Sequence, residues 1–463
     1  MATNKRIVGW YFFDWASQPF HTLLVTFIFG PFFAATATGY FAGAGLDEQA
    51  ADARAQSLWS LALTVSGLIV GFGAPFLGAL ADRARRRIPW LIGFSVVYVI
   101  AASALWFTDP GGSNLAFALI MFGCGFIVAE YALIFTNAQL PGLASRKEIG
   151  RLSGSGFAFG YLGGLIALIV ALLLLVEQPG GTTIIGLPPG LGFLDAETRE
   201  GTRAVGPFVA LWFAVFMIPY FLWVREDRSR VAAVPPLPVM TKVVQSVRAL
   251  KGRPSLASYL GGSMLYRDAL NGLYSFGGTY AVLVLDWEIT QIGVFGIVSV
   301  ISAAVLSWIG GRLDRRFGPK PVIIGAVLVL TVVCIVVANM SRETFFGVAL
   351  ADGSGLPDTV FLICGVLIGG LGGTLQAASR TMMVRHTDLG SETEGFGLYG
   401  LAGRATAFLA PGLIGVVTAI TGDVRNGVLP LILLFLLGLV LLRWTKPEGD
   451  RADPWSETSS PPV

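Results

Sequence analysis

The chain alternates long apolar stretches with short polar connections. Residues 9–33, GWYFFDWASQPFHTLLVTFIFGPFF, are apolar enough to cross a bilayer, although Asp14, Gln18 and His21 lie in their first half. A helix needs about 20 apolar residues to cross the hydrocarbon layer. By this criterion the sequence predicts twelve membrane spans, near residues 9–41, 56–81, 88–107, 113–140, 149–176, 206–224, 255–284, 289–312, 319–340, 358–385, 393–421 and 426–444.

The composition of the chain also indicates a membrane protein. Hydrophobic residues make up 54% of the 463 residues, charged residues make up only 13%, and the mean hydropathy is +0.70. A soluble fold of this length cannot hide so much apolar surface from water, whereas a bilayer can. The first stretch is too long for the apolar core of a signal peptide, so we expect it to be retained as the first span.

Charge and cysteine usage exclude several other classes of protein. The net charge of +3 gives nucleic-acid binding no electrostatic basis. Cys124, Cys334 and Cys364 all lie in apolar stretches, and the chain has only two histidines, which disfavours a disulfide framework or a Cys/His metal site. We therefore predict no metal and no cofactor.

The basic residues orient the spans. Most of the 32 lysines and arginines lie at the N-terminus, in the loops that lead from even-numbered to odd-numbered spans, and in the tail. The opposite loops hold only Arg54, Arg199, Arg203, Arg342 and Arg425. The positive-inside rule then predicts that both termini are cytoplasmic, in a plasma or inner membrane.

The longest cytoplasmic connection divides the spans into two sets of six. We expect an N-terminal six-helix bundle over 1–224, a cytoplasmic linker over 225–254 and a C-terminal six-helix bundle over 255–445. Within the linker, VMTKVVQSVRALKG has the spacing of an interfacial amphipathic helix. The tail, 446–463, has the composition of a disordered segment.

Two loops repeat one motif at matching positions in the two sets. Gly-x-x-x-Asp-Arg begins at Gly78, after the second span, and again at Gly310, after the eighth. YFFDWA in the first span likewise pairs with LYRDAL in the seventh, which places Asp14 opposite Asp268. Such internal symmetry is expected of two related helical bundles around a central path.

This repeated motif resembles the signature of the major facilitator superfamily. The resemblance implies an all-α integral membrane fold, with twelve transmembrane helices in two pseudo-symmetric six-helix bundles, and a latch on the cytoplasmic side. In SETEGF, Ser391 stands three residues before Glu394 and predicts a capping box, and the resemblance implies that this helix end faces the Asp82 loop. The alternative is that the arginines only set the topology. We expect the cytoplasmic gate to consist of Asp14, Asp82, Arg83, Arg86, Asp314, Arg315 and Glu394.

Longer stretches resemble one branch of that superfamily. FFDWASQPF in the first span, TNAQLPGLASRKEIGRLSGSGFAFGYLGG at 136–164, GGTLQAASRTMM at 372–383 and EGFGLYGLAGRATAFLAPGLIG at 394–415 are similar to segments of the vacuole-effluxer-like branch. That branch is named for a fungal vacuolar amino-acid effluxer tied to autophagy. The chain departs from it at Phe12 and Phe13, where the branch has leucine and tyrosine. The resemblance implies efflux of a small, amino-acid-like metabolite.

Polar side chains in the first span indicate a path through the membrane. An ionisable group inside the bilayer costs about 2.5–3.5 kcal/mol, so it usually faces a cavity or a partner. Asp14, Gln18 and His21, at i, i+4 and i+7, share one face of an α-helix. An Asp14–His21 pair could relay protons, because histidine titrates near neutrality. Alternatively, Asp14 lies close to the start of the span, pairs with a rim arginine and steadies the gate, and His21 is structural.

The fourth span carries the best candidate for a proton acceptor. Glu130 is an isolated carboxylate, with Asn137 seven residues on and roughly on the same face. Burial would raise the pKa of such a carboxylate and let it bind and release a proton during transport. The alternative is a structural salt bridge from Glu130 to Arg380 or Arg404.

The second set of spans supplies candidates for solute binding. Asp268 and Asn271 share a face of the seventh span, and Gln376 and Arg380 share a face of the tenth. Arginine suits bidentate binding of a carboxylate, and Gln376 could bond an amino or amide group. Arg404 in the eleventh span is a rival anchor, in which case Arg380 would belong to the gate.

These patterns predict a secondary active transporter that works by alternating access. The chain has no GxxxxGK[ST] loop for nucleotide phosphates, so we expect protons rather than ATP to drive it. An enzyme is disfavoured, because neither GxSxG nor HExxH occurs. The alternative is a non-transporting sensor or assembly factor with a transporter-like fold. The expected partners are a small solute, protons and the lipid bilayer, and we expect a monomer.

Overall fold

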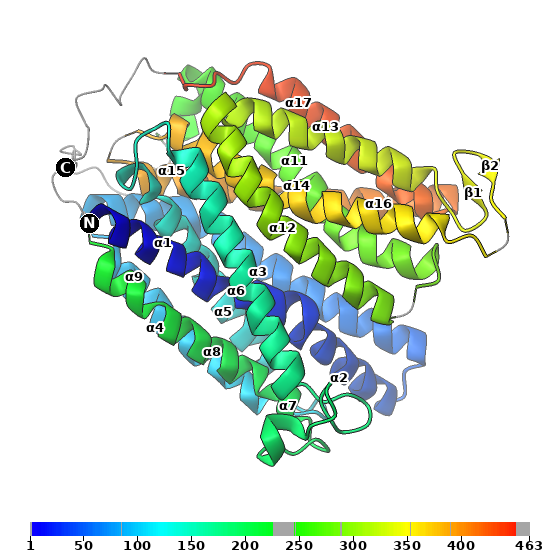
Figure 1. Ribbon diagram of the computed structural model, residues 1–463. Helices are drawn as coiled ribbons and strands as arrows, with labels where there is room; N and C mark the ends of the chain where they lie inside the picture. Colours follow the sequence, from blue (N-terminus) through cyan, green and yellow to red (C-terminus); the bar gives the residue numbers. More distant parts are fainter. Residues whose placement is uncertain are drawn as a thin grey trace. The chain divides into compact units, whose positions relative to one another are not determined.

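The computed structural model describes residues 2–84, 86–225, 245, 247–287, 289–351, 353–388 and 390–450. Most of these residues are helical, as expected where a bilayer offers the backbone no other hydrogen-bond partner. The first half contains α1 (Ala2–Pro19), α2 (Phe29–Gly43), α3 (Glu48–Ala84), α4 (Ile88–Ala104), α5 (Leu115–Asn137), α6 (Ile149–Leu174), α7 (Glu200–Arg203), α8 (Val205–Phe216) and α9 (Ile218–Trp223). The second half contains α11 (Pro254–Leu283), α12 (Ile289–Phe317), α13 (Pro319–Ala338), α14 (Leu356–His386), α15 (Glu392–Ala405), α16 (Leu409–Thr421) and α17 (Leu429–Leu442) (Figure 1).

Among the described residues, eleven helical stretches are long and apolar enough to cross a membrane. They correspond to all the predicted spans except the seventh. At the seventh, α11 is long enough, with 30 residues, but it carries Arg267, Asp268 and Asn271 together with several serines and glycines. All the predicted spans are therefore helical, and the most polar of them is α11.

The first and eleventh spans are interrupted helices. α1 begins at Ala2, before the predicted start at residue 9, and changes after Pro19 into a π-helical segment, Phe20–Phe27. Proline lacks the N–H that would continue the α-helical ladder. Because the helix begins earlier, Asp14 lies about three turns from its start, and the role of Asp14 near the start of the membrane span stays a prediction. In the eleventh span, residues 406–408 separate α15 from α16.

Contacts divide the chain into two compact units. Unit 1 contains Met1–Val70, Arg86–Thr136 and Phe159–Glu226, and unit 2 contains Gly71–Arg85, Asn137–Ala158 and Asp227–Val463. Unit 2 thus combines the second half of the chain with segments of α3 and α6 and the chain that follows α5. The predicted division into bundles at 1–224 and 255–445 stays a prediction. Most of the predicted linker, 225–254, and the end of the tail, 451–463, lie outside the described residues.

Aromatic side chains form much of the core of unit 1. Within it, α4 packs against α8, and α1 packs against α8 and α9. The rings of Tyr98 and Phe213 stack with centroids 3.9 Å apart, and those of Trp59 and Phe122 lie 4.4 Å apart. Such pairs stabilise a core beyond the area that they bury.

In unit 2, α12 lies against α14, α14 against α13, and α11 against α17 (Figure 1). The end of unit 2 where α12 and α14 finish and α6 begins is called the basic end below. It carries Arg146, Arg151, Arg312, Arg315, Arg316 and Arg385. The other end, the hairpin end, carries β1 (Thr344–Phe345), which pairs antiparallel with β2 (Val348–Ala349).

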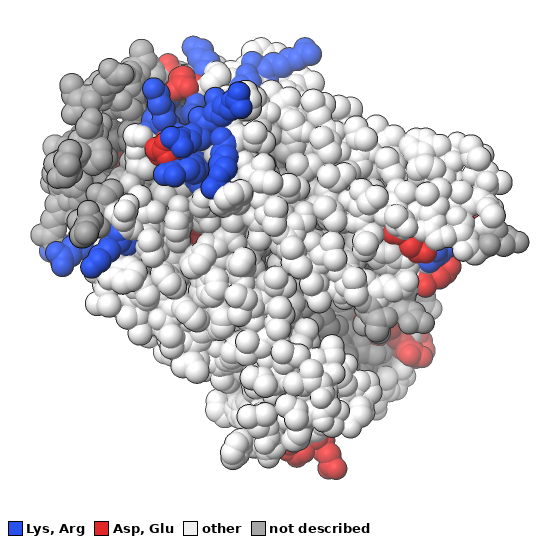
Figure 2. Space-filling view, viewed as in Figure 1, with Lys and Arg blue, Asp and Glu red and all other residues white. Residues whose placement is uncertain are grey.

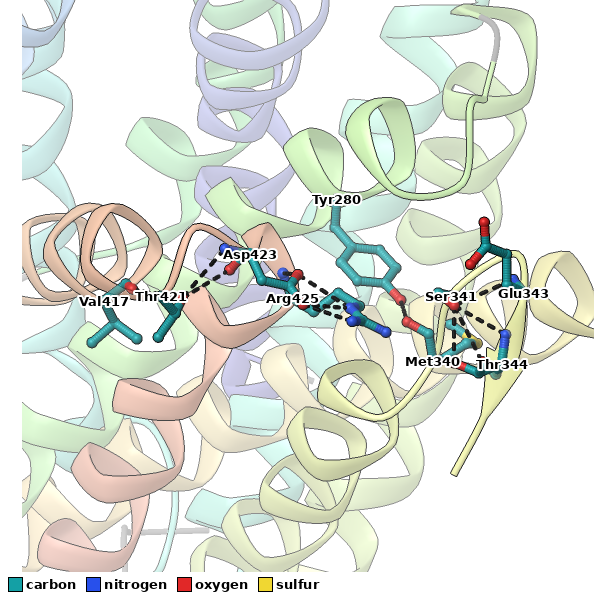
Figure 3. A network of polar contacts seen from close by, with 9 residues as sticks. All are labelled: Tyr280, Met340, Ser341, Glu343, Thr344, Val417, Thr421, Asp423 and Arg425. Carbon is teal, nitrogen blue, oxygen red and sulfur yellow. Dashed lines mark hydrogen bonds and ion pairs between the residues drawn. The ribbon is translucent and has the colours of Figure 1, made fainter. Parts of the chain in front are cut away.

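Polar contacts fasten the hairpin end (Figure 3). The Tyr280 hydroxyl of α11 donates a 2.6 Å hydrogen bond to the Met340 carbonyl, just before the hairpin. Between α16 and α17, Arg425 donates a 2.6 Å hydrogen bond to the Asp423 carboxylate. Hydrogen bonds from Arg425 lower the pKa of the Asp423 carboxyl, so the pair stays charged in neutral and mildly acidic solution.

Candidate functional site

In unit 1, an imidazole and a carboxylate form a close pair. His21 Nε2, in the π-helical segment, lies 3.7 Å from Glu130 Oε1 of α5. The Glu130 side chain is 13% exposed and that of His21 is 35% exposed. The rings of Phe20 and Phe126 lie 6.2 and 6.0 Å from the His21 ring. π-Helical segments are rare and often occur at functional sites, and this one places two titratable groups together beside aromatic rings.

The polar stripe predicted on the first span divides between two neighbouring helices. A Cβ on Gly160 of α6 would lie 3.1 Å from Asp14 Cβ, and one on Gly164 would lie 2.9 Å from Gln18 Cγ. Asp14 and Gln18 therefore lie at α6, whereas His21 pairs with Glu130 of α5. The prediction of one shared face assumed a regular α-helix, and the helix type changes between Gln18 and His21. The structure pairs His21 with the carboxylate of Glu130, and a relay between Asp14 and His21 stays a prediction.

In unit 2, Asp82 caps the first turn of α15. Its Oδ2 accepts a 2.9 Å hydrogen bond from the Glu394 backbone N–H, and its Oδ1 accepts one of 3.3 Å from that of Thr393. The predicted contact between the Asp82 loop and this helix end is thus present. The predicted capping box is wrong, because Ser391 stands at the N-cap but makes no side-chain capping bond. The Asp82 carboxylate binds the amide groups that a serine cap would have bound.

Asp314 stands in the matching position on the second copy of the motif. A Cβ on Gly150, in the first turn of α6, would lie 2.4 Å from Asp314 Cγ. Asp314 is only 2% exposed. The carboxylate thus lies beside the positive N-terminal end of α6, which favours a negative charge there. The motif therefore places one buried aspartate at a helix N-terminus in each copy.

Arg380 of α14 is buried and bound by residues of the first half of the chain. Its Nη1 donates a 3.0 Å hydrogen bond to Asn137 Oδ1 at the end of α5. Its Nε and Nη2 donate to the Ser153 hydroxyl and carbonyl of α6, at 2.9 and 2.8 Å. The guanidinium also lies 4.3 Å from the centroid of the Phe157 ring. With these donors occupied, Arg380 and Asn137 in this structure fit a lock between helices better than a solute anchor.

Glu148, which sequence reasoning missed, holds two arginines at the basic end. Glu148 Oε1 lies 2.7 Å from Arg315 Nε, and its Oε2 lies 2.8 Å from Arg151 Nε. The predicted gate residue Arg315 thus has its partner just before α6. The signal was present in the sequence, because SRKEIGR places an acid among basic residues in a loop expected at the same end as Arg315.

Asp268, in the middle of α11, lies at the break in the eleventh span. Its Oδ2 accepts a 3.1 Å hydrogen bond from the Ala410 backbone N–H, in the first turn of α16. The neighbouring Arg267 lies 4.2 Å from the centroid of the Tyr399 ring of α15. Asp268 is buried and Asn271 is exposed. Asp268 therefore caps the start of α16 at the helix break.

The remaining predicted site residues are less enclosed. Gln376 of α14 is half-buried, and so is Arg404, which lies in the last turn of α15. Cations are stabilised at such a position by the helix dipole. Arg86 is exposed, and the side chain of Arg83 lies outside the described residues.

The start of the tail is bound rather than disordered. Asp450 accepts hydrogen bonds of 2.9 and 3.0 Å from the Ser255 and Leu256 backbone N–H groups, at the start of α11. Glu448 lies 2.6 Å from Arg146 and 2.8 Å from Arg385. The prediction of disorder is thus wrong for Lys446–Asp450, because its acids find helix-end amides and arginines that composition alone does not reveal.

Within the described residues, no cluster of three or more His, Cys, Asp or Glu side chains could hold a metal ion. What the structure brings together is a titratable pair in unit 1 and, in unit 2, a set of contacts between the two halves of the sequence at the basic end.

Comparisons with known proteins agree on one family. A family model described as "Vacuole effluxer Atg22 like" matches residues 2–453. The MFS-type transporter YxiO of Bacillus subtilis, itself uncharacterised, is 22% identical over 449 residues, and the match covers 96% of each chain. Autophagy-related protein 22 of Cryptococcus neoformans is 23% identical over 320 residues, which is 67% of this chain and 53% of that protein. The match thus spans about half the length of that fungal relative.

Solved structures with the same fold are transporters. The human organic anion transporter MFSD10 superposes with a TM-score of 0.71 at 14% identity, over 95% of this chain and 99% of that one. FucP in its outward conformation superposes with a TM-score of 0.68 at 13% identity, over 96% of this chain and 99% of that one. The relatives and structural neighbours are transporters, not enzymes. This chain is accordingly a multi-pass membrane transporter of the major facilitator superfamily, and within it the chain belongs to the vacuole effluxer Atg22-like family.

Proposed function

We propose that the protein is a proton-driven secondary transporter that carries out efflux of a small, zwitterionic, amino-acid-like metabolite by alternating access. The family description supports efflux, and the amino-acid character of the solute rests on the resemblance to the fungal vacuolar effluxer. The observation that carries the proton coupling is the 3.7 Å pair of His21 and Glu130.

The pair has the properties that a proton carrier needs. A carboxylate inside a bilayer is costly when it is charged and unpaired, so Glu130 gains from either a proton or a protonated His21. A change in the environment of the pair during transport therefore shifts the proton between bound and released states. A proton moving down 100 mV supplies about 2.3 kcal/mol, which is enough to bias two conformations.

The solute-binding residues in this proposal are polar side chains that are exposed or half-buried. Gln18 and Gln376 supply amide groups, and Arg404 supplies a cation for a carboxylate. Asn271 lies one helical turn beyond Asp268 on α11 and is exposed. Arg380 and Asn137, which the sequence places on this path, bind each other in this structure, and in the proposal they lock helices together rather than hold the solute.

The gate in this proposal is the basic end of unit 2, and it faces the cytoplasm. Three contacts at this end each join an element of the first half of the sequence to one of the second. They are Asp82 with the start of α15, Asp314 with the start of α6, and Arg315 with Glu148. Separation of these contacts would open the path on that side. The excess of basic residues in the loops at this end supports cytoplasmic termini, in a plasma or inner membrane. Arg83 and Glu394 complete this end of the gate. Asp14 and Arg86, which belong to unit 1, stay predicted gate residues, and the transporter acts as a monomer.

Transport by the purified protein in proteoliposomes tests the proposal. Under an imposed pH gradient, we expect a mixture of amino acids and dipeptides to yield at least one transported solute. Glu130→Gln should abolish the dependence on the pH gradient while the protein stays folded, whereas Glu343→Gln, at an exposed carboxylate of the hairpin, should transport normally. Failure to move any zwitterion would overturn the solute class, and unchanged pH dependence in Glu130→Gln would remove Glu130 from the coupling.

A further inference from the structure

An open cavity of about 430 Å³ at the basic end is lined by four arginines: Arg151, Arg312, Arg315 and Arg316. Arg151 belongs to the first turn of α6, and the other three belong to the last turns of α12. The two helices meet closely beside the cavity, because a Cβ on Gly154 would lie 2.6 Å from Gly311 Cα. Figure 2 shows a dense group of Lys and Arg side chains near the top of the view, with uncharged side chains over most of the visible surface.

The charge of this cavity is only partly neutralised. Glu148 binds Arg151 and Arg315 through their Nε atoms. Arg312 donates to the Trp308 carbonyl of its own helix, and in the part of the chain that the structure describes Arg316 has neither a hydrogen bond nor an ion pair. Four arginines and one glutamate leave an excess of positive charge around an open space. Guanidinium groups bind phosphate oxygens in bidentate geometry.

An apolar stripe leads along α12 to the cavity. Ile301, Val305 and Trp308 follow one another at helical spacing, and they are 45%, 52% and 47% exposed. Leu313 and Phe317 continue the exposed apolar surface beside the arginines. The Arg312 guanidinium lies 3.2 Å from the centroid of the Trp308 ring. Tryptophan at the boundary between an apolar stripe and arginines is typical of the headgroup level of a membrane.

We propose that this cavity binds the phosphate of an anionic phospholipid, whose acyl chain lies along the exposed stripe of α12. The phosphate sits among Arg151, Arg312, Arg315 and Arg316, and the arginines not held by Glu148 supply most of its donors. Basic pockets between spans at the cytoplasmic surface suit such headgroups, because that leaflet carries the anionic lipids. Arginines that only set topology would show no preference for one headgroup in a saturable site.

Native mass spectrometry of the purified protein in a neutral detergent tests this site. Phosphatidylglycerol and phosphatidylcholine with the same short acyl chains are titrated separately, and the occupancy of a first bound lipid is measured. We expect phosphatidylglycerol to be retained more tightly. Each lysine or arginine near the surface contributes about 1 kcal/mol to anionic-lipid attraction. The double variant Arg312→Gln/Arg316→Gln removes two such charges and should therefore weaken phosphatidylglycerol binding about 30-fold. It should leave phosphatidylcholine binding unchanged.

The matched control removes two exposed charges elsewhere. Arg54→Gln/Lys251→Gln alters side chains that do not line the cavity and should bind phosphatidylglycerol like the unmodified protein. Equal retention of the two lipids, or equal loss in both double variants, overturns the proposal. Inorganic phosphate and glycerol phosphate distinguish a free anion from a lipid, because efficient competition by either at lipid-like concentration would show a soluble-anion site and also overturn it. Thermal unfolding of each variant verifies that it is folded.

Discussion

Asp82 Oδ2 accepts a 2.9 Å hydrogen bond from the backbone N–H of Glu394, so the end of the second span caps the start of the eleventh. The second copy of the motif places Asp314 against Gly150, at the start of α6. Each aspartate comes from one half of the sequence and each helix start from the other. The repeat therefore places an aspartate beside a helix start of the other half twice at one end of unit 2. The same residue type suits both places because a carboxylate complements a helix N-terminus.

Removal of the Asp82 cap should destabilise the protein. Asp82→Ala leaves the Thr393 and Glu394 amides without their acceptor, and loss of an N-cap costs about 0.5–2 kcal/mol. Ser391→Ala, at the N-cap position itself, should have almost no effect, because that side chain makes no capping bond. Thermal unfolding in detergent measures both variants, and Asp82→Asn, which keeps one oxygen, should lie between them. Equal melting temperatures for Asp82→Ala and Ser391→Ala would contradict the capping role.

A methyl group at Gly150 should force α6 and Asp314 apart. The added Cβ would lie 2.4 Å from Asp314 Cγ, and overpacking of this kind typically costs about 1–3 kcal/mol. The control is Gly325→Ala in α13, where the added Cβ would meet nothing within 4 Å and should be neutral or should stabilise the helix by up to about 1 kcal/mol. Unfolding temperature and transport are measured for both. If Gly150→Ala matched Gly325→Ala in both assays, the close contact between Gly150 and Asp314 would contribute neither to stability nor to transport.

The sequence predicts these connections better than it predicts the residues around them. Asp82 and Asp314 were recognisable because the motif occurs twice at matching places, and a repeat is a strong signal even without a structure. The twelve helical segments were equally accessible, because the length of an apolar stretch is set by bilayer thickness. α11 shows the limit of that reasoning, since its polar face makes it the least apolar of them.

Pairings between distant segments lay beyond the sequence. The sequence marks Glu130 as a candidate, but it does not predict the pairing of Glu130 with His21. That pairing depends on the change from α-helix to π-helix after Pro19, because the helix type sets the direction of the His21 side chain. Ser153 was inconspicuous among the small residues of its helix, yet it supplies two acceptors to Arg380. Periodicity places a side chain on a face of a regular helix, and it cannot show which neighbour covers that face.

Loss of Asp450 should weaken the attachment of the tail to α11 more than loss of Glu448. Asp450→Ala removes the acceptor for two amides at a helix start, at a cost of about 1 kcal/mol. Glu448→Gln breaks ion pairs of a side chain that is 62% exposed, and such pairs contribute about 0–1 kcal/mol. Thermal unfolding should therefore rank Asp450→Ala below Glu448→Gln, and high salt should reduce only the effect of the latter. The reverse order would show that the ion pairs of Glu448 hold the tail.

The two interpretations of Arg380, helix lock and solute anchor, predict different behaviour for Ser153. If Arg380 is a lock, Ser153→Ala and Arg380→Lys both lower the unfolding temperature. Their effects are then non-additive by about 0.5–3 kcal/mol, because the residues are in direct contact. Lysine does not replace the arginine here, since it lacks the fork that reaches both Asn137 and Ser153.

If Arg380 is instead an anchor, Arg380→Lys raises the KM for the transported solute, whereas Ser153→Ala leaves it unchanged. A double-mutant cycle on stability, combined with KM for the three variants in proteoliposomes, separates these outcomes. We expect Arg380 to act as a lock, because it is 2% exposed and three of its donors are bound. A solute would have to displace Asn137 and Ser153 before it could reach this guanidinium.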